Sequence, residues 1–164
     1  MDQRRVVTGT QDGREAIVRD ERVDGIRVHG SETTVIFTAD GVLSVPNDGE
    51  GVPLVRSLQE VRFPAAGALL VGTFRLAPNS TAVAPGPSAH DSEDRPGYHS
   101  TDSVDVDIVL EGEIVYEGEG GSLTTLRRGD WIIVNGTKHA WHNKSSADAM
   151  VLSVVCGARR LGGE

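Results

Sequence analysis

Two short stretches of this sequence contain the residue types that acid–base and metal chemistry require. Residues 98–114 read YHSTDSVDVDIVLEGEI, and residues 129–143 read GDWIIVNGTKHAWHN. Neutral imidazoles and carboxylates bind first-row divalent metal ions, and the same groups transfer protons near neutral pH. Each stretch combines a short β-type run with a Gly or Asn turn signal. The candidates for this chemistry are His99, Asp105, Asp107, His139 and His142.

The direction in which the first stretch faces decides whether this chemistry is possible. Within VDVDIVL the apolar side chains alternate with Asp105 and Asp107, so the two aspartates share one face of a strand. Taken alone, this pattern is typical of a strand whose acids face water. If the acids point inward instead, the Val and Ile face must be covered by N-terminal strands or by a second chain. The inward orientation therefore predicts a homodimer.

The elements that would position these residues are β-strands. Runs rich in Val, Ile and Thr alternate with turn clusters such as QDG, ADG and EGEGGS, and helical periodicity is weak throughout. No linker divides the chain, so we expect one domain, in which residues 1–60 form an N-terminal β extension and residues 61–160 form a barrel. The proline-rich segment 78–97 is expected to be a long loop.

The composition limits the classes of partner that this protein is expected to bind. A chain of 164 residues with net charge −8 lacks the basic surface that nucleic acids and anionic membranes require, so we expect neither partner. No run approaches the roughly 20 apolar residues of a membrane span, and the N-terminus lacks a signal-peptide core. Cys156, the single cysteine, lies in the apolar run MVLSVVC and is expected in the core. These features favour the cytoplasm.

The two stretches together resemble the two-part motif of the cupin superfamily. In the first part, Gly112 matches the closing glycine, His99 the first histidine and Asp105 the acidic position, whereas Thr101 stands at the second histidine. The segment HSTDSVD looks closest to the small single-domain cupins that carry H-x-T-D-T-x-D. In the second part, His139 and Asn143 match, with Gly129 upstream, but Val134 replaces the usual proline. The opening glycine of the first part is replaced by Glu93.

The resemblance implies an all-β, double-stranded β-helix (jelly-roll) barrel with a metal site inside. His99, Asp105 and His139 would hold a divalent ion (Fe, Mn, Ni or Zn), and Asp107 and His142 would transfer protons. Residues predicted to contact substrate are Thr101, Arg75, Trp141 and Asn143. Trp141 also suits a core position, and Arg75 a surface position.

The function expected from this reasoning is a metal-dependent enzyme for a small molecule, of lyase type: decarboxylation, dehydration or isomerisation next to a carbonyl. Two alternatives stay open. Loss of one imidazole at Thr101 is also consistent with a non-catalytic small-molecule binding cupin. The set of two histidines and one carboxylate also supports an iron-dependent oxygenase.

Overall fold

The computed structural model describes residues 2–28, 30–49, 54–57, 60–83, 90–91, 95 and 97–161. Every regular element among them is a β-strand, and the predicted all-β class is confirmed. The interior of the predicted loop 78–97 lies largely outside the described residues. Within the described part of the chain no helix is long and apolar enough to cross a membrane.

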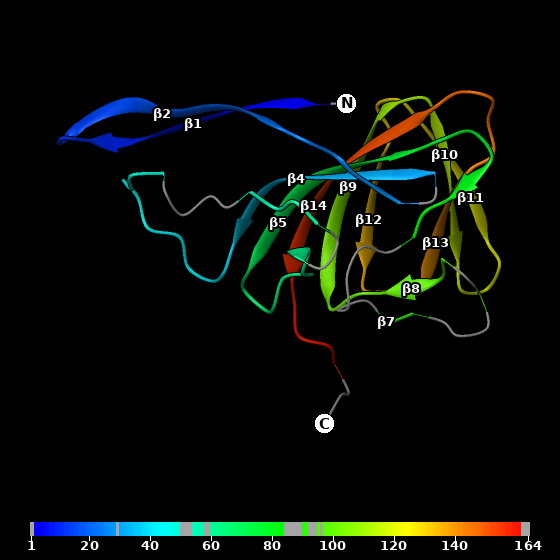
Figure 1. Ribbon diagram of the computed structural model, residues 1–164. Coiled ribbons are helices and arrows are strands. Elements are labelled where there is room, and N and C mark those ends of the chain that lie inside the picture. The colour runs from blue at the N-terminus through cyan, green and yellow to red at the C-terminus, as the bar shows by residue number, and fades with distance from the viewer. Residues whose placement is uncertain are drawn as a thin grey trace.

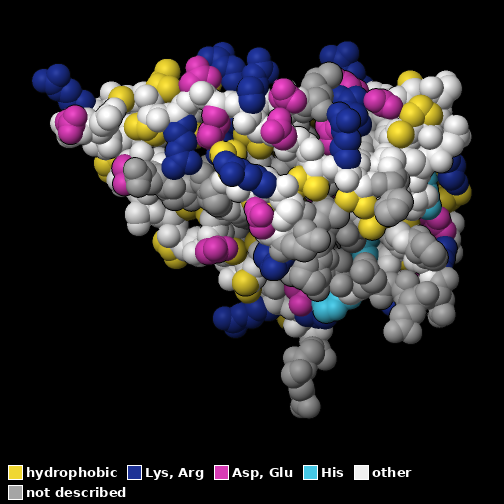
Figure 2. All heavy atoms as spheres, viewed as in Figure 1, with side chains coloured by type: hydrophobic (Ala, Val, Ile, Leu, Met, Phe, Trp, Pro, Cys, Tyr) yellow, Lys and Arg dark blue, Asp and Glu magenta, His cyan; other side chains and the backbone are white. Residues whose placement is uncertain are grey.

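A hairpin at the N-terminus extends to one side of the barrel (Figure 1), and Thr10 N in it donates to the Asn47 carbonyl at 2.7 Å. It consists of β1 (Gln3–Gln11) and β2 (Arg14–Val23). Asp12 and Gly13 both adopt positive φ, 51° and 72°, as a two-residue hairpin turn requires. Basic and acidic side chains intermix over the hairpin and the adjoining surface (Figure 2), and Arg4 pairs with Asp20 at 2.7 Å.

One face of the barrel is an antiparallel sheet that joins distant parts of the chain. Two of its strands come from the segment 1–60: β3 (Ile26–Val28) pairs with β4 (Ser31–Ala39), and β4 pairs with β5 (Leu69–Leu76). In spatial order the strands are β12 (Trp131–Asn135), β9 (Ser103–Glu111), β14 (Ala149–Gly157), β5 (Leu69–Leu76), β4 (Ser31–Ala39) and β3 (Ile26–Val28).

The opposite sheet supplies the other wall. Its order is β11 (Leu123–Arg127), β10 (Glu113–Gly118), β13 (His139–Asn143), β8 (His99–Ser100) and β7 (His90–Asp91), with β6 (Ser80–Thr81) also paired to β13. The two sheets face each other (Figure 1), which confirms the predicted jelly-roll barrel.

The core lies between the sheets, in two clusters of apolar side chains. The larger includes Leu76 and Ile114, both fully buried, and the smaller centres on Val35 and Leu70. Cys156, in contrast, is exposed on β14, which corrects its predicted core position. Because β14 alternates, Val155 points into the barrel and Cys156 points out.

Candidate functional site

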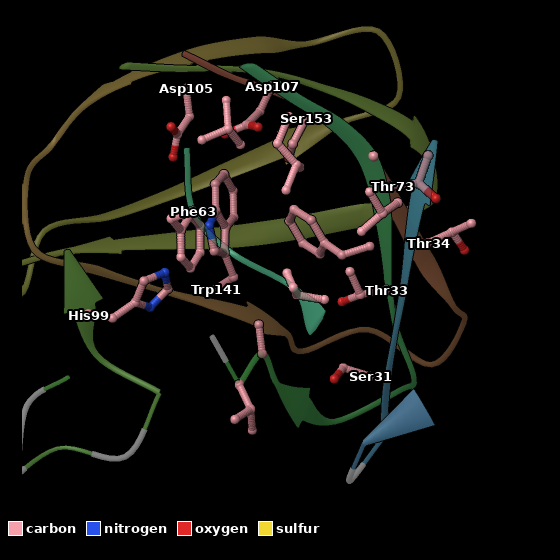
Figure 3. A pocket seen from close by; sticks show the side chains of 18 of the residues that line it. Ser31, Thr33, Thr34, Phe63, Thr73, His99, Asp105, Asp107, Trp141 and Ser153 are labelled. Carbon is pink, nitrogen blue, oxygen red and sulfur yellow. The ribbon is translucent and has the colours of Figure 1, made fainter. Parts of the chain in front are cut away.

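A cavity of about 90 Å³ lies inside the barrel, lined by both sheets. Figure 3 shows Asp105, Asp107 and Ser153 grouped at one end, His99 apart from them, and the rings of Phe63 and Trp141 between these groups in this view. The cavity therefore has polar groups at separate positions and aromatic walls between them.

Strand β9 turns its acids into this cavity. Ser103, Asp105, Asp107 and Val109 are buried, whereas the residues between them are only partly buried. Of the two orientations that the sequence left open, the structure has the inward one. The neighbouring strands fix it, because β9 pairs with β12 on one side and β14 on the other, so a register shift is disfavoured.

Asp105 is held by a chain of hydroxyl groups. The Ser103 hydroxyl donates to Asp105 Oδ1 at 2.6 Å, and Ser103 Oγ also lies 2.7 Å from Thr101 Oγ1. Burial raises the pKa of Asp105, against the Ser103 hydrogen bond and the charge of His99, which lower it. Thr101 thus orders the hydroxyl chain that positions this carboxylate.

Asp107 is the least satisfied polar group among the described residues. Its Oδ1 atom is buried and has no hydrogen-bond partner. Burial raises the pKa of Asp107 to about 7, the charge of Asp105 adds to the rise, and a hydrogen bond from Ser153 opposes it. A cavity-lining acid that titrates near neutrality can both give and accept a proton.

His99 and His139 form a pair across β8 and β13. They stand in direct register, with ring centroids 4.5 Å apart. Nδ1 of His99 lies 3.1 Å from the Gly97 carbonyl and Nδ1 of His139 lies 2.8 Å from the Thr137 carbonyl. Because a carbonyl only accepts, each neutral ring carries its proton on Nδ1 and keeps a lone pair on Nε2.

Burial and a neighbouring charge keep the His139 ring neutral. Burial lowers the pKa of His139 to about 4, and the charge of His99 lowers it further, against the Thr137 carbonyl. Tyr116 stacks on the His139 ring, with a centroid distance of 5.3 Å and an interplanar angle of 17°. A neutral imidazole in this tautomer is suited to binding a metal ion or accepting a proton through Nε2.

The residues fit a metal ion only in part. The two imidazoles have the tautomer of metal-binding histidines, but no group of three His, Cys, Asp or Glu side chains converges on one point in the described parts of the chain. The structure brings His99 and His139 together and does not bring Asp105 to them as a third ligand.

The other predicted residues divide into those inside and those outside the cavity. Trp141 lines it and packs against Phe74, 5.7 Å between ring centroids. His142 follows Trp141 on β13 and points to the other side, where its Nδ1 lies 2.9 Å from Thr81 Oγ1 and its Nε2 lies 2.9 Å from Glu117 Oε2. The structure therefore does not place His142 among the proton-transfer groups of the cavity, because strand alternation separates it from His139.

Arg75 and Asn143 also lie away from the cavity lining. The Arg75 guanidinium pairs with Glu111 at 3.0 Å and with Asp148 at 3.5 Å, so charge pairing holds it at the barrel surface. The Asn143 amide donates to the carbonyls of Leu76 and Ala147, at 3.0 and 2.7 Å, and so fixes a turn. These contacts correct the predicted role of both residues in substrate binding.

Sequence reasoning missed most of the cavity lining, including Ser153 and Phe63. Ser153 lies opposite Asp107 on β14, and its signal was a lone hydroxyl inside the apolar run MVLSVVC. Phe63 precedes β5 outside any strand and reaches the cavity only through the tertiary fold. Its sequence neighbourhood carries no comparable signal.

Comparison with known proteins points to one family. Residues 81–155 match the family model described as Cupin domain. The chain is 44% identical over 65 residues to Oryzines biosynthesis cluster protein J of Aspergillus oryzae, covering 39% of this chain and 36% of that protein. It is 42% identical over 55 residues to Phomopsin biosynthesis cluster protein D of Diaporthe leptostromiformis, covering 31% of this chain and 29% of that protein. The chain thus spans about a third of these curated relatives.

One solved structure supports the fold, and a second is reported for comparison. The polyketide cyclase RemF of Streptomyces resistomycificus superposes with a TM-score of 0.52 at 13% identity, covering 81% of this chain and 72% of that one. The Cupin_2 domain of an XRE family transcriptional regulator from Enterobacter cloacae superposes with a TM-score of 0.42 at 20% identity, covering 56% of this chain and 83% of that one. At this identity the first likeness shows a shared fold alone.

Proposed function

Because the chain belongs to the cupin superfamily, with that family's domain over residues 81–155, we propose that it is an enzyme that binds a small organic molecule in the barrel and transfers a proton there. The observation that carries this proposal is the state of Asp107: its buried Oδ1 atom has no hydrogen-bond partner among the described residues, and burial raises its pKa to about 7. Groups with such pKa values cluster at catalytic sites.

Asp107 is the general acid or base of this proposal. A carboxyl group with a pKa near 7 is populated in both protonation states at neutral pH, so it can remove a proton and return it. Decarboxylation, dehydration and isomerisation next to a carbonyl each need such a transfer. His139 lines the same cavity and stays neutral, because burial lowers its pKa to about 4.

A divalent metal ion (Fe, Mn, Ni or Zn) is the cofactor of the proposal. His99 and His139 would hold it through Nε2, since both Nδ1 atoms face backbone carbonyls. When bound, the ion supplies Lewis acidity that polarises a carbonyl. The Ser103 hydroxyl holds Asp105 in place inside the same barrel.

Two alternatives each rest on an observation. The lack of a third convergent ligand in the described residues favours a non-catalytic binding protein, because a site with two imidazoles holds a metal less tightly. The imidazole pair also suits an iron-dependent oxygenase, and an anaerobic assay separates that reaction from proton transfer. The names of the relatives, proteins of biosynthesis clusters, favour a small organic molecule in each case.

A homodimer is the assembly that we propose. On the outer face of the first sheet, Ile133 pairs with Val106 and Val106 with Val154, which gives an apolar row across three strands. Trp131 and Ile133 are 61% and 51% exposed there. A continuous apolar sheet face of this kind favours association. The free Cys156 suits a reducing, cytoplasmic location.

Deuterium exchange tests the proposed chemistry without a known product. Small keto acids and hydroxy ketones are incubated in D₂O with the protein, and NMR follows deuterium uptake at the carbon next to the carbonyl. We expect uptake with the native protein and none with Asp107→Asn, at unchanged metal content. Loss of metal in that variant would make Asp107 a ligand, and absence of uptake with every compound would favour the binding protein.

A further inference from the structure

The cavity combines one unpaired acceptor with apolar walls. Asp107 is 3% exposed, and its Oδ1 atom has no donor from the described residues. An unpaired buried acceptor is unfavourable in the free protein, and a ligand that donates a hydrogen bond relieves it. The atom that faces Asp107 in a bound molecule should therefore belong to a hydroxyl or amine group.

The walls around this acceptor suit a flat apolar ring. Trp141 and Phe74 pack at a tilt of 55°, and Phe63 lines the same cavity (Figure 3). Leu70 and Val35 complete this side. Aromatic rings prefer such tilted and offset neighbours. A cavity of about 90 Å³ has room for a single small ring.

In the metal-free protein, the charges of the cavity disfavour the binding of anions. Of the described residues that line the cavity, none is Lys or Arg, and two are the aspartates of β9. Arg75, the predicted carboxylate clamp, is paired with Glu111 and Asp148 instead. A carboxylate or phosphate in the cavity would meet like charge without a protein cation to compensate it.

We propose that the cavity selects a small uncharged aromatic ring with a hydroxyl group, a phenol, whose hydroxyl donates to Asp107 Oδ1 while the ring packs against the wall formed by Trp141, Phe74 and Phe63. This inference rests on the proposed function of the barrel as a small-molecule site and names the class of molecule. Asp107 recognises the hydroxyl, and the aromatic walls recognise the ring.

Three probes of similar size test the selection: phenol, fluorobenzene, which replaces the hydroxyl by a poor hydrogen-bonding atom, and benzoate. Binding is followed by ¹⁹F NMR of fluorobenzene and by its displacement. The indole NH signal of Trp141 reports on the cavity, and that of Trp131, which is 61% exposed on β12, serves as the internal control. We expect phenol to bind about tenfold more tightly than fluorobenzene, benzoate to bind most weakly, and only the Trp141 signal to shift.

The variant Asp107→Leu removes the acceptor and keeps the cavity apolar, and Glu119→Gln on the exposed surface is its control. Phenol should lose its advantage in Asp107→Leu, while fluorobenzene still binds. Equal binding of phenol and fluorobenzene to the native protein, or preference for benzoate, would overturn the inference and leave the barrel as a small-molecule site. Failure of every probe to shift Trp141 would count against the site itself. Even if Asp107→Leu does not fold, the comparison of phenol, fluorobenzene and benzoate on the native protein still tests the proposed selection.

Discussion

His99 and His139 face each other in register across β8 and β13, with their rings 4.5 Å apart and each Nδ1 against a backbone carbonyl. The backbone thereby sets the tautomer of both rings, and the two Nε2 atoms keep their lone pairs. Asp105 and Asp107 occupy a different strand, β9, in the same cavity. This arrangement puts imidazoles and carboxylates in one interior without joining them in a single cluster.

Replacing either imidazole should weaken metal binding. In calorimetric titration of untagged protein with Ni²⁺, we expect His99→Ala and His139→Ala each to bind at least about tenfold more weakly than the native chain, since each removes one of two ligands. His90→Ala is the control, because His90 is exposed and pairs with Asp102. Native-like affinity in both variants would exclude the imidazole pair as the metal site.

The buried acid should make stability depend on pH. In metal-free protein the pKa of Asp107 is about 7, well above its value in the unfolded chain. Between these two pKa values the folded state binds the extra proton, so Asp107 contributes stability at low pH that is lost as pH rises through about 7. The free energy of unfolding of Asp107→Asn should therefore increase relative to that of the native protein as pH rises from 4 to 8. Urea unfolding should show an increase on the order of a few kcal/mol.

His139 should make stability depend on pH in the opposite direction to Asp107. Its folded pKa of about 4 lies below the unfolded value, so the unfolded state binds more protons in this window and stability falls as pH falls from about 6.5 to about 4. Between pH 4 and 6.5 this effect opposes that of Asp107, so the native protein should show little net change there, and His139→Gln should gain stability relative to the native protein as the pH falls from about 6.5 to about 4. A stability difference between His139→Gln and the native protein that does not change with pH would contradict the neutral, buried state of the ring.

Truncating a core side chain should lower the free energy of unfolding far more than truncating a surface side chain. Leu76 is 0% exposed and belongs to the larger core cluster, so Leu76→Ala should lower the free energy of unfolding by about 2–5 kcal/mol. Leu123, 57% exposed on β11, is the matched control, with an expected change below about 0.5 kcal/mol. Urea unfolding followed by tryptophan fluorescence measures both. Similar losses would place the core elsewhere.

The proposed dimer depends on the outer face of β12. Sedimentation velocity should show a dimer for the native chain and a monomer for Ile133→Lys, because a charge in the centre of an apolar interface is desolvated without a partner. Leu161→Lys in the C-terminal tail, where the leucine is 95% exposed, is the control and should stay dimeric. A native monomer would exclude this assembly.

The sequence predicted the strands because turn residues mark their ends. The expectation that His99 and His139 share one interior site came from the resemblance to cupins, and the structure places the two residues in register. Alternation within β9 correctly grouped Asp105 with Asp107. The sequence could not decide which side of that strand was inside, since this depends on pairing with β12 and β14.

The remaining site residues depended on tertiary contacts. His142 is one position from Trp141, and strand alternation alone carries it out of the cavity to Glu117. Arg75 is drawn to Glu111 and Asp148, which are distant in sequence. Neither partner is visible in a local pattern, so sequence reasoning assigned both side chains to a cavity that they do not line.

Titration of the Asp107 side chain tests the central claim most directly. In metal-free protein labelled with ¹³C at aspartate, the Asp107 carboxyl signal is assigned by comparison with Asp107→Asn and followed from pH 3 to pH 9. Burial of this carboxyl, whose Oδ1 atom has no partner among the described residues, predicts a midpoint of about 7. A midpoint near ~3.9, the value of an aspartate in water, would contradict the account of Asp107 as the proton-transferring group of the barrel.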